Sequence, residues 1–257
     1  MTARVLVTRP AGAWPALATR FSGTSIVVQC TPTTIQADPI DPRPGEVALD
    51  QLRRCDWLVV TSGRGIAALA GRLAARGVQG LPVGMRVAAV GPATARALES
   101  IGAPAAIVAE DAGAEGLAVA LRPRLGVGAR VLIVRPEGPL SLLAASLRKG
   151  GTEVHEAPLY RTVASELAPG LANEAIDGAF AGVAFTAPSS LDLWLEAAGE
   201  RRAALFAAIG RVKRIAIGKT TAAHLAAVAL PADAVADAPS ELAVGDAIAR
   251  AVLPSTC

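Results

Sequence analysis

The chain's 257 residues are enough for two modest domains, whose cores must be packed from small aliphatic side chains because 52% of residues are hydrophobic and only 3% aromatic. A net charge of +3 with dispersed arginines excludes a nucleic-acid-binding surface; it suits a small polyanion and equally an ordinary solvated surface. Apolar runs stop short of the ~20 residues that a membrane-spanning helix needs, so no membrane segment is expected.

Short apolar runs alternate with Ala-, Leu- and Arg-rich stretches of helical period. This alternation is typical of βα units that form parallel sheets buried on both faces, and it predicts an α/β fold. Strands are expected at residues 4–8, 25–29, 56–60, 86–90, 105–108, 130–134, 152–156, 181–185, 213–217 and 227–230. Helices are expected at residues 13–21, 46–53, 63–76, 92–100, 113–124, 138–149, 188–197, 201–209, 219–226 and 239–251.

One half of the chain repeats the other. Residues 131–138 (VLIVRPEG) resemble residues 5–12 (VLVTRPAG) 126 positions earlier, and residues 217–222 (IGKTTA) resemble residues 90–95 (VGPATA) 127 positions earlier. A near-constant offset of about half the chain predicts two copies of one α/β module. A ligand site is most easily built in a cleft between two such copies.

Two segments interrupt the alternation at matching places, just after the second strand of each copy. They are residues 31–46, which contain four prolines, and residues 160–169. Corresponding connections of this kind arise where a chain crosses from one domain to the other and back. We therefore expect a discontinuous first domain, residues 1–33 plus 163–257, and a second domain of residues 36–160, with linkers near 33–36 and 160–163.

Four predicted strands end in a turn that carries Thr or Ser and opens a helix. In an open parallel sheet such turns line the crevice at the carboxyl edge, where ligands bind. Free N–H groups at the helix start and a hydroxyl together suit carboxylate or phosphate oxygens. The alternative for each hydroxyl is a structural N-cap without a ligand. The candidate binding residues are Thr61, Ser62, Thr94, Ser189, Thr220 and Thr221.

Four cationic side chains are expected at the same edge. Arg9 and Arg135 follow the first strand of each copy, Arg64 follows the turn at 60–62, and Lys219 opens a helix. A guanidinium can bind a carboxylate through two parallel hydrogen bonds, which makes each arginine a candidate binding residue. Each could instead hold its own turn, since a proline directly follows Arg9 and Arg135.

Tyr160 is the only tyrosine of the chain and lies at the second connection, outside the predicted core strands. A phenol there could donate a proton to a leaving group and so be catalytic; alternatively, its ring could simply anchor the connection. His155 and His224 are expected in a strand and a helix, so no acid–base pair of histidines is predicted.

Other common chemistries lack their motifs. Cys30, Cys55 and Cys257 have no metal-ligand spacing and are predicted to be reduced thiols, so no metal is expected. Neither a glycine-rich nucleotide loop nor a serine-hydrolase elbow is present, so no nucleotide cofactor is expected. The N-terminus lacks a basic stretch with an apolar signal core, which predicts a cytoplasmic location.

In order and spacing, these segments resemble the uroporphyrinogen-III synthase family over nearly the whole chain. The resemblance implies two similar, flavodoxin-like α/β domains with parallel sheets, joined by a two-stranded linker, with the substrate in the cleft between them. The segments that carry it are 5–10 (VLVTRP), 60–62 (VTS), 90–95 (VGPATA), 160–162 (YRT), 185–189 (FTAPS), 218–222 (GKTTA) and 239–241 (PSE).

The resemblance also implies an activity. Enzymes of this family cyclise hydroxymethylbilane, a linear tetrapyrrole with eight carboxylates, to uroporphyrinogen III with inversion of ring D and loss of water, in tetrapyrrole biosynthesis. They need no cofactor. By this resemblance Tyr160 assists departure of the terminal hydroxyl, while hydroxyls such as those of Thr61 and Thr220 hold carboxylates. We expect a monomer, with transient contact to the deaminase that makes the substrate.

Two alternatives to an enzyme remain open. A two-lobed binding protein that closes on a small anion would carry the same hinge, cleft and turns. A regulatory relative of the synthases could keep the fold and recognise a tetrapyrrole without cyclising hydroxymethylbilane. Tyr160 and the paired Thr220 and Thr221 favour a working enzyme.

Overall fold

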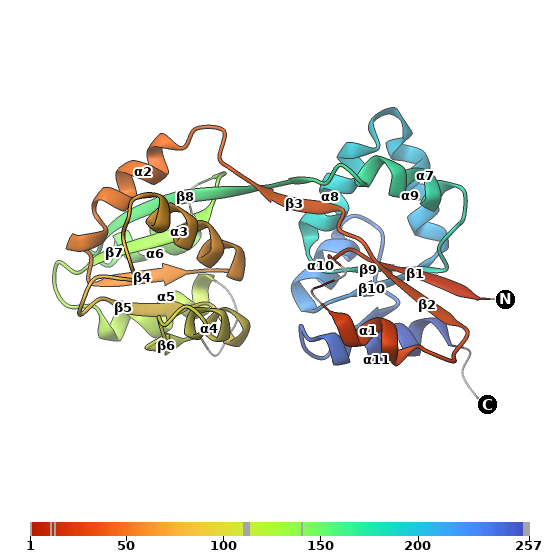
Figure 1. The fold of residues 1–257 in the computed structure, drawn as a ribbon, viewed down its shortest axis with the longest axis horizontal. Coiled ribbons are helices and arrows are strands. Elements are labelled where there is room, and N and C mark those ends of the chain that lie inside the picture. The colour runs from red at the N-terminus through yellow and green to blue at the C-terminus, as the bar shows by residue number, and fades with distance from the viewer. Residues whose placement is uncertain (1, 11, 13, 110–113, 140, 254–257) are drawn as a thin grey trace. The chain divides into compact units, whose positions relative to one another are not determined.

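The chain forms two compact units in the computed structural model, which describes residues 2–253 apart from 11, 13, 110–113 and 140. Unit 1 consists of Met1–Ile35 and Thr162–Cys257, and unit 2 of Gln36–Arg161. Unit 1 therefore combines the start of the chain, drawn red to orange in Figure 1, with its last part, drawn teal to blue, while unit 2 is the continuous middle segment.

Unit 1 is built on a five-stranded sheet in the order β11-β10-β9-β1-β2, in which every pair of neighbours is parallel. Parallel pairing explains the run of buried Val, Leu and Ala in the central strands, because helices cover both faces. The strands are β1 (Ala3–Val7), β2 (Ile26–Cys30), β9 (Gly182–Phe185), β10 (Lys213–Ala216) and β11 (Ala234–Val235).

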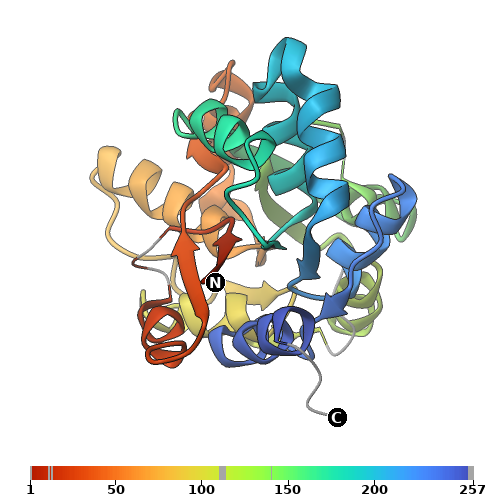
Figure 2. The same ribbon diagram turned by 90° about the vertical axis from the view of Figure 1, so that its right-hand side faces the viewer.

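The helices of unit 1 divide between the two faces of its sheet. One core cluster joins the sheet to α1 (Pro15–Arg20) and α11 (Glu241–Val252), drawn red and dark blue in Figure 2. The other cluster joins the opposite face to four helices. These are α7 (Ala168–Ile176), α8 (Pro188–Ala197), α9 (Arg202–Arg211), which follows the 3₁₀ turn η4 (Gly199–Arg201), and α10 (Lys219–Ala227).

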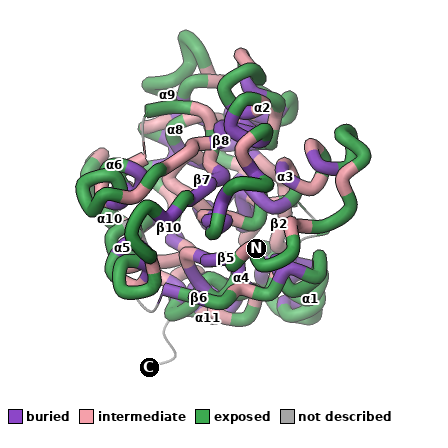
Figure 3. The backbone as a smooth tube through the Cα atoms, turned by 90° about the vertical axis from the view of Figure 1, so that its left-hand side faces the viewer, coloured by how far each residue is buried: buried purple, intermediate pink, exposed green. Residues whose placement is uncertain are grey.

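Unit 2 is built on a six-stranded sheet in the order β3-β8-β7-β4-β5-β6. The five strands from β8 to β6 are parallel, and the buried middle of the sheet is purple in Figure 3. The strands are β3 (Thr34–Ala37), β4 (Trp57–Val60), β5 (Arg86–Ala89), β6 (Ile107–Val108), β7 (Arg130–Pro136) and β8 (Glu153–Ala164).

The helices of unit 2 also cover both faces of the sheet. One core cluster includes α2 (Arg43–Asp50), η2 (Leu52–Arg54), α3 (Gly63–Ala75) and α4 (Pro92–Glu99). The opposite cluster includes α5 (Ala114–Leu121), which η3 (Arg122–Arg124) follows, and α6 (Leu142–Lys149). Serine side chains begin two of these helices, since Ser62 accepts a hydrogen bond from Gly65 N and Ser141 from Ala144 N.

The two units repeat one topology. The order β6-β5-β4-β7-β8 in unit 2 corresponds strand for strand to β11-β10-β9-β1-β2 in unit 1. The repeated segments 5–12 and 131–138 contribute to β1 and β7, the same strand in each copy. The predicted fold class, two similar α/β modules with parallel sheets, is therefore confirmed.

Several predicted elements need correction. The strand expected at 227–230 is wrong: α10 extends to Ala227, the backbone turns at Ala229 with a φ of 61°, and the last strand is β11. The break expected at 160–169 is also wrong in part, because β8 continues to Ala164 and α7 begins at Ala168. β3 lies within the proline-rich segment where no strand was expected. Residues 13, 113 and 140 of the predicted helices, and Cys257, fall outside the described residues.

Candidate functional site

Each sheet has one position where a ligand is most readily bound. In doubly wound sheets this is the carboxyl edge between the two strands whose following helices cover opposite faces. In unit 2 these strands are β4 and β7, because α3 and α6 belong to opposite core clusters. In unit 1 they are β9 and β1, which are followed by α8 and α1.

In unit 2 this edge brings Ser62 and Tyr160 together. Ser62 is the N-cap of α3, and its Oγ accepts a hydrogen bond from Gly65 N at 3.1 Å. The Tyr160 hydroxyl lies 2.8 Å from the same Oγ, although the two residues are 98 positions apart. The Tyr160 carbonyl accepts a hydrogen bond from Glu137 N, which fixes the tyrosine beside the end of β7. Two hydroxyls are thus held in contact at the carboxyl edge.

Tyr160 lies at the end of unit 2, two residues before unit 1 resumes at Thr162. The structure corrects one point: the residue is inside a strand, β8, and is 4% exposed, whereas the sequence placed it outside the strands. Its ring therefore packs in unit 2, and its hydroxyl is the part that can do chemistry. When the Ser62 hydroxyl donates its proton to Tyr160, the phenol proton is left for a ligand, and the Gly65 amide stabilises this arrangement.

Thr61 differs from its counterpart in unit 1. In unit 1, Thr186 donates to the Thr8 carbonyl at 2.9 Å and its N–H donates to Thr8 Oγ1 at 3.0 Å, so these groups link β9 to β1. In unit 2, Val134 stands where the repeat places Thr8, and the Thr61 hydroxyl makes no hydrogen bond within the described residues. Thr61 therefore offers a ligand a hydroxyl that Thr186 does not.

The other predicted hydroxyls lie at the starts of three helices. Thr94 is buried in the first turn of α4 and Thr221 in the first turn of α10. Ser189 is partly buried near the start of α8, and Thr220 is exposed near the start of α10. β9 and β10 are neighbouring strands, so their helices α8 and α10 begin at the same edge of unit 1.

The four cations have different surroundings. Arg9 lies over the Trp14 ring, with its Cζ 4.5 Å from the ring centroid. Arg64 is exposed in the first turn of α3, and Lys219 is the exposed first residue of α10. Arg64 therefore lies in the helix turn that Ser62 caps, while Arg9 and Lys219 belong to the carboxyl edge of unit 1.

Arg135 is engaged within unit 2. Its Nε lies 2.7 Å from Glu156 Oε2, and its Nη1 donates to the carbonyls of Pro136 and Gly138. Glu156 is buried and also pairs with Arg148 at 2.8 Å. These contacts fix the loop after β7 and favour the structural alternative for Arg135.

Two polar features at the unit 1 edge were not predicted. Ser190 is 1% exposed, and its Oγ has no hydrogen-bond partner among the described residues. His224 Nε2 lies 2.8 Å from Asp192 Oδ1 and links α10 to α8. The run of two serines at 189–190 was a signal for the first; nothing in the sequence pairs His224 with Asp192, which lies 32 positions away.

Within the described part of the chain, no helix is long and apolar enough to cross a membrane. No group of three or more His, Cys, Asp or Glu side chains there could hold a metal ion.

Comparison with known proteins identifies relatives of the chain. It is 30% identical over 159 residues to the uroporphyrinogen-III synthase of Synechococcus elongatus, a match that covers 62% of the chain and 60% of that protein. It is 38% identical over 139 residues to a provisionally named uroporphyrinogen-III synthase of Methanothermobacter thermautotrophicus, covering 52% of the chain and 54% of that protein. The chain thus matches only about half to three fifths of the length of these curated relatives.

Solved structures show the same fold. A mutant uroporphyrinogen III synthase from Thermus thermophilus has a TM-score of 0.68 at 24% identity, with 97% of the chain and 98% of that protein covered. The synthetase from Helicobacter pylori has a TM-score of 0.59 at 20% identity, with 96% and 97% covered. The family model described as uroporphyrinogen-III synthase HemD matches residues 15–244. Since that match takes in most of both units, the chain belongs to the uroporphyrinogen-III synthase family.

Proposed function

We propose that the chain is a working uroporphyrinogen-III synthase, which cyclises hydroxymethylbilane to uroporphyrinogen III with loss of water. Membership of the family supports the substrate class. The observation that carries a catalytic role is the 2.8 Å contact between the Tyr160 hydroxyl and Ser62 Oγ at the carboxyl edge of unit 2. A working enzyme is supported because this buried phenol can donate its proton to a ligand when the Ser62 hydroxyl donates to the phenol oxygen.

In this proposal Tyr160 acts on the leaving group. The terminal hydroxyl of hydroxymethylbilane takes a proton from the phenol and departs as water, while the nitrogen lone pair of ring A supplies the electrons. Transfer of the ring A N–H proton to the phenolate then gives the neutral azafulvene and restores Tyr160. The substituted carbon of ring D attacks the electrophilic methylene of the azafulvene to form a spiro intermediate. The older bond from that carbon to its bridge then breaks, and ring D turns and closes the macrocycle through its free α-carbon, which loses its proton. No electrons leave the substrate, so the reaction is balanced without an oxidant or a reductant.

The remaining hydroxyls hold the substrate's carboxylates. Thr61, Thr94, Ser189 and Thr220 each lie at or near the start of a helix, where backbone N–H groups and the helix dipole favour negative charge. Charge-assisted hydrogen bonds contribute about 1.5–3 kcal/mol each, so several together can hold a flexible tetrapyrrole although no single one is indispensable.

The chain's main contribution is geometric. Hydroxymethylbilane also closes without an enzyme, to the symmetrical type I isomer, so the protein must favour the spiro route over direct closure. A cytoplasmic location, a monomeric state and transient contact with the deaminase that makes the substrate belong to the same proposal.

Product analysis tests the function. The purified chain is supplied with hydroxymethylbilane generated in situ by its deaminase, the products are oxidised, and the porphyrin isomers are separated by chromatography. We expect predominantly type III porphyrin. If only type I formed, as in the control without the chain, the chain would be a binding protein or an inactive relative.

A further inference from the structure

A hollow of about 370 Å³ lies at the amino-terminal edge of the unit 2 sheet, the edge opposite to Ser62. Its three arginines come from separate segments: Arg54 ends η2, Arg86 is the first residue of β5, and Arg130 is the first residue of β7. Because β4 pairs in parallel with both β5 and β7, the starts of these segments meet at one edge. We call this hollow the amino-edge pocket.

Two of the arginines are held in place by their neighbours. Arg86 lies over the ring of buried Trp57, with its Cζ 4.3 Å from the ring centroid. Arg130 Nε donates to Glu153 Oε2 at 3.1 Å. Arg54, by contrast, has no ion-pair or hydrogen-bond partner for its guanidinium in the described part of the chain. The pocket therefore gathers three arginines against two carboxylates, Asp56 in its lining and Glu153 paired with Arg130, so its net charge is positive.

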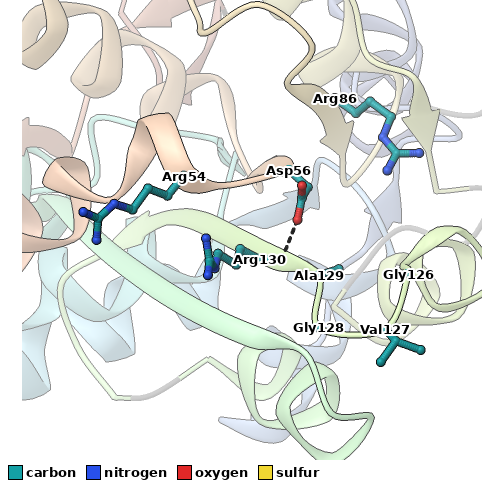
Figure 4. A pocket seen from close by; sticks show the side chains of 8 residues that line it. All are labelled: Arg54, Asp56, Arg86, Gly126, Val127, Gly128, Ala129 and Arg130. Carbon is teal, nitrogen blue, oxygen red and sulfur yellow. Dashed lines mark hydrogen bonds between the residues drawn. The ribbon is translucent and has the colours of Figure 1, made fainter.

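The Asp56 carboxylate lies between the arginines of the pocket (Figure 4). Its Oδ2 accepts a hydrogen bond from the backbone N–H of Arg130 at 2.8 Å, the dashed line in Figure 4. In that view Arg54 and Arg130 extend to one side of Asp56, and Arg86 lies on the other side. A carboxylate between the cations repels an anion at the centre, so the pocket favours a ligand with separated anionic groups.

The loop at residues 126–129 adds backbone donors to the wall of the pocket. The loop is a turn closed by the hydrogen bond from Ala129 N to the Gly126 carbonyl, with Gly128 at a φ of +71°. The N–H groups of Gly126, Val127 and Gly128 make no hydrogen bond to the rest of the described chain. Neither glycine has an atom within 4 Å of where a Cβ would stand, so an oxyanion can approach this backbone.

We propose that the amino-edge pocket binds a small polyanion that carries at least two carboxylate or phosphate groups. The arginines supply forked donors that match both kinds of oxyanion, and the loop supplies N–H donors. The pocket lies at the opposite end of the β4 strand from Ser62, and neither Ser62 nor Tyr160 lines it.

Calorimetric titration of the full chain with citrate and, separately, with pyrophosphate tests the proposal, with ionic strength held constant by NaCl because exposed charges are screened. We expect saturable binding of one or both probes; citrate alone would assign carboxylates and pyrophosphate alone would assign phosphates. Arg54→Gln should weaken binding about tenfold. Asp56→Asn keeps an oxygen acceptor for Arg130 N and should tighten binding, since it removes the repelling charge.

Arg53→Gln is the matched control. Arg53 is the exposed neighbour of Arg54 in η2 and does not line the pocket, so its loss removes the same charge without touching the site. Circular dichroism should show that all three variants are folded. The proposal is overturned if neither probe binds saturably, if Arg53→Gln weakens binding as much as Arg54→Gln, or if Asp56→Asn weakens it. Retained binding in Tyr160→Phe would separate this site from the proposed reaction centre.

Discussion

At the scale of single residues, Ser62 has two partners that make separate contributions. Its Oγ caps α3 through Gly65 N and contacts the Tyr160 hydroxyl. Ser62→Ala should therefore lower the free energy of unfolding by about 1 kcal/mol, the usual loss for an N-cap, and should also slow formation of the type III product. Urea unfolding and the porphyrin isomer assay measure the two effects.

Ser100→Ala is the control for that variant. Ser100 ends α4 in the same unit and donates to the Ala97 carbonyl at 2.8 Å, at the opposite end of that helix from Thr94. It should lose stability to a similar or smaller extent while keeping the rate and the isomer ratio. Equal losses of activity in both variants would show that Ser62 acts only through stability.

Cys55 is predicted to be an unreactive thiol. Burial raises the pKa of the Cys55 thiol to about 11, and the Asp56 and Glu153 carboxylates act in the same direction while Arg130 opposes them. Because the thiolate is the reactive form, only about 0.1% of Cys55 is reactive at pH 8. The alkylation rate should rise about tenfold for each unit by which the pH is raised, up to about pH 11. Peptide mass spectrometry after iodoacetamide treatment gives the rate, with the urea-unfolded chain as reference; rapid alkylation of the folded chain at pH 8 would contradict this.

The sequence was enough to identify the candidate hydroxyls, but it could not show which of them already make hydrogen bonds within the protein. The turns that contain Thr61 and Thr186 look equivalent in the sequence, yet Thr186 bonds to Thr8, 178 positions away. Arg135 looks like Arg9, yet Arg135 forms an ion pair with Glu156, 21 positions later, at 2.7 Å. Such partners are set by which strands become neighbours, and a local pattern does not contain that information.

At the scale of elements, α2 packs against β8 at a position that only glycine can occupy. A Cβ at Gly45 would lie 2.8 Å from the Pro158 carbonyl oxygen and 2.9 Å from Leu159 Cδ2. Gly45→Ala should therefore destabilise the chain by about 1–3 kcal/mol, the usual cost of overpacking, because a backbone carbonyl cannot move aside cheaply. The midpoint of urea unfolding measures this change.

Gly71→Ala should change stability in the opposite direction. Gly71 lies within α3, and a Cβ there would meet no atom within 4 Å. Alanine in a helix interior is about 0.5–1 kcal/mol more favourable than glycine, so this variant should raise the unfolding midpoint. An unchanged or raised midpoint for Gly45→Ala, measured beside this control, would mean that α2 can shift away from β8.

Sequence periodicity located most elements and failed where an element departs from ordinary lengths or composition. β8 has 12 residues with Pro158 in its middle, so it looked like a short strand followed by a break. α7 carries Pro169 and Gly170 in its first turn, residues that usually interrupt a helix pattern, although proline is tolerated there. The apolar run at 227–230 has neither the length nor the alternation to separate a strand from a helix end.

At the scale of the whole molecule, the repeat made the topology predictable. Two copies of one βα pattern imply two sheets with one strand order, and the structure has that order in both units. We further propose that each unit is a cooperative domain. Gly45→Ala should then reduce hydrogen-exchange protection in β4, β5 and β7 while leaving β1, β9 and β10 unchanged. Equal loss of protection in both sheets would instead indicate one cooperative unit.

The role of Tyr160 is tested most directly by the rate of type III porphyrin formation in Tyr160→Phe beside the wild-type chain, with Ser100→Ala in parallel. In that role the Tyr160 hydroxyl, held by Ser62 at the carboxyl edge of unit 2, helps the terminal hydroxyl to leave. It predicts a fall of about 100-fold, typical for loss of a general acid, a larger share of type I, and near-normal activity in the control. A Tyr160→Phe variant with the wild-type rate and isomer ratio would contradict it.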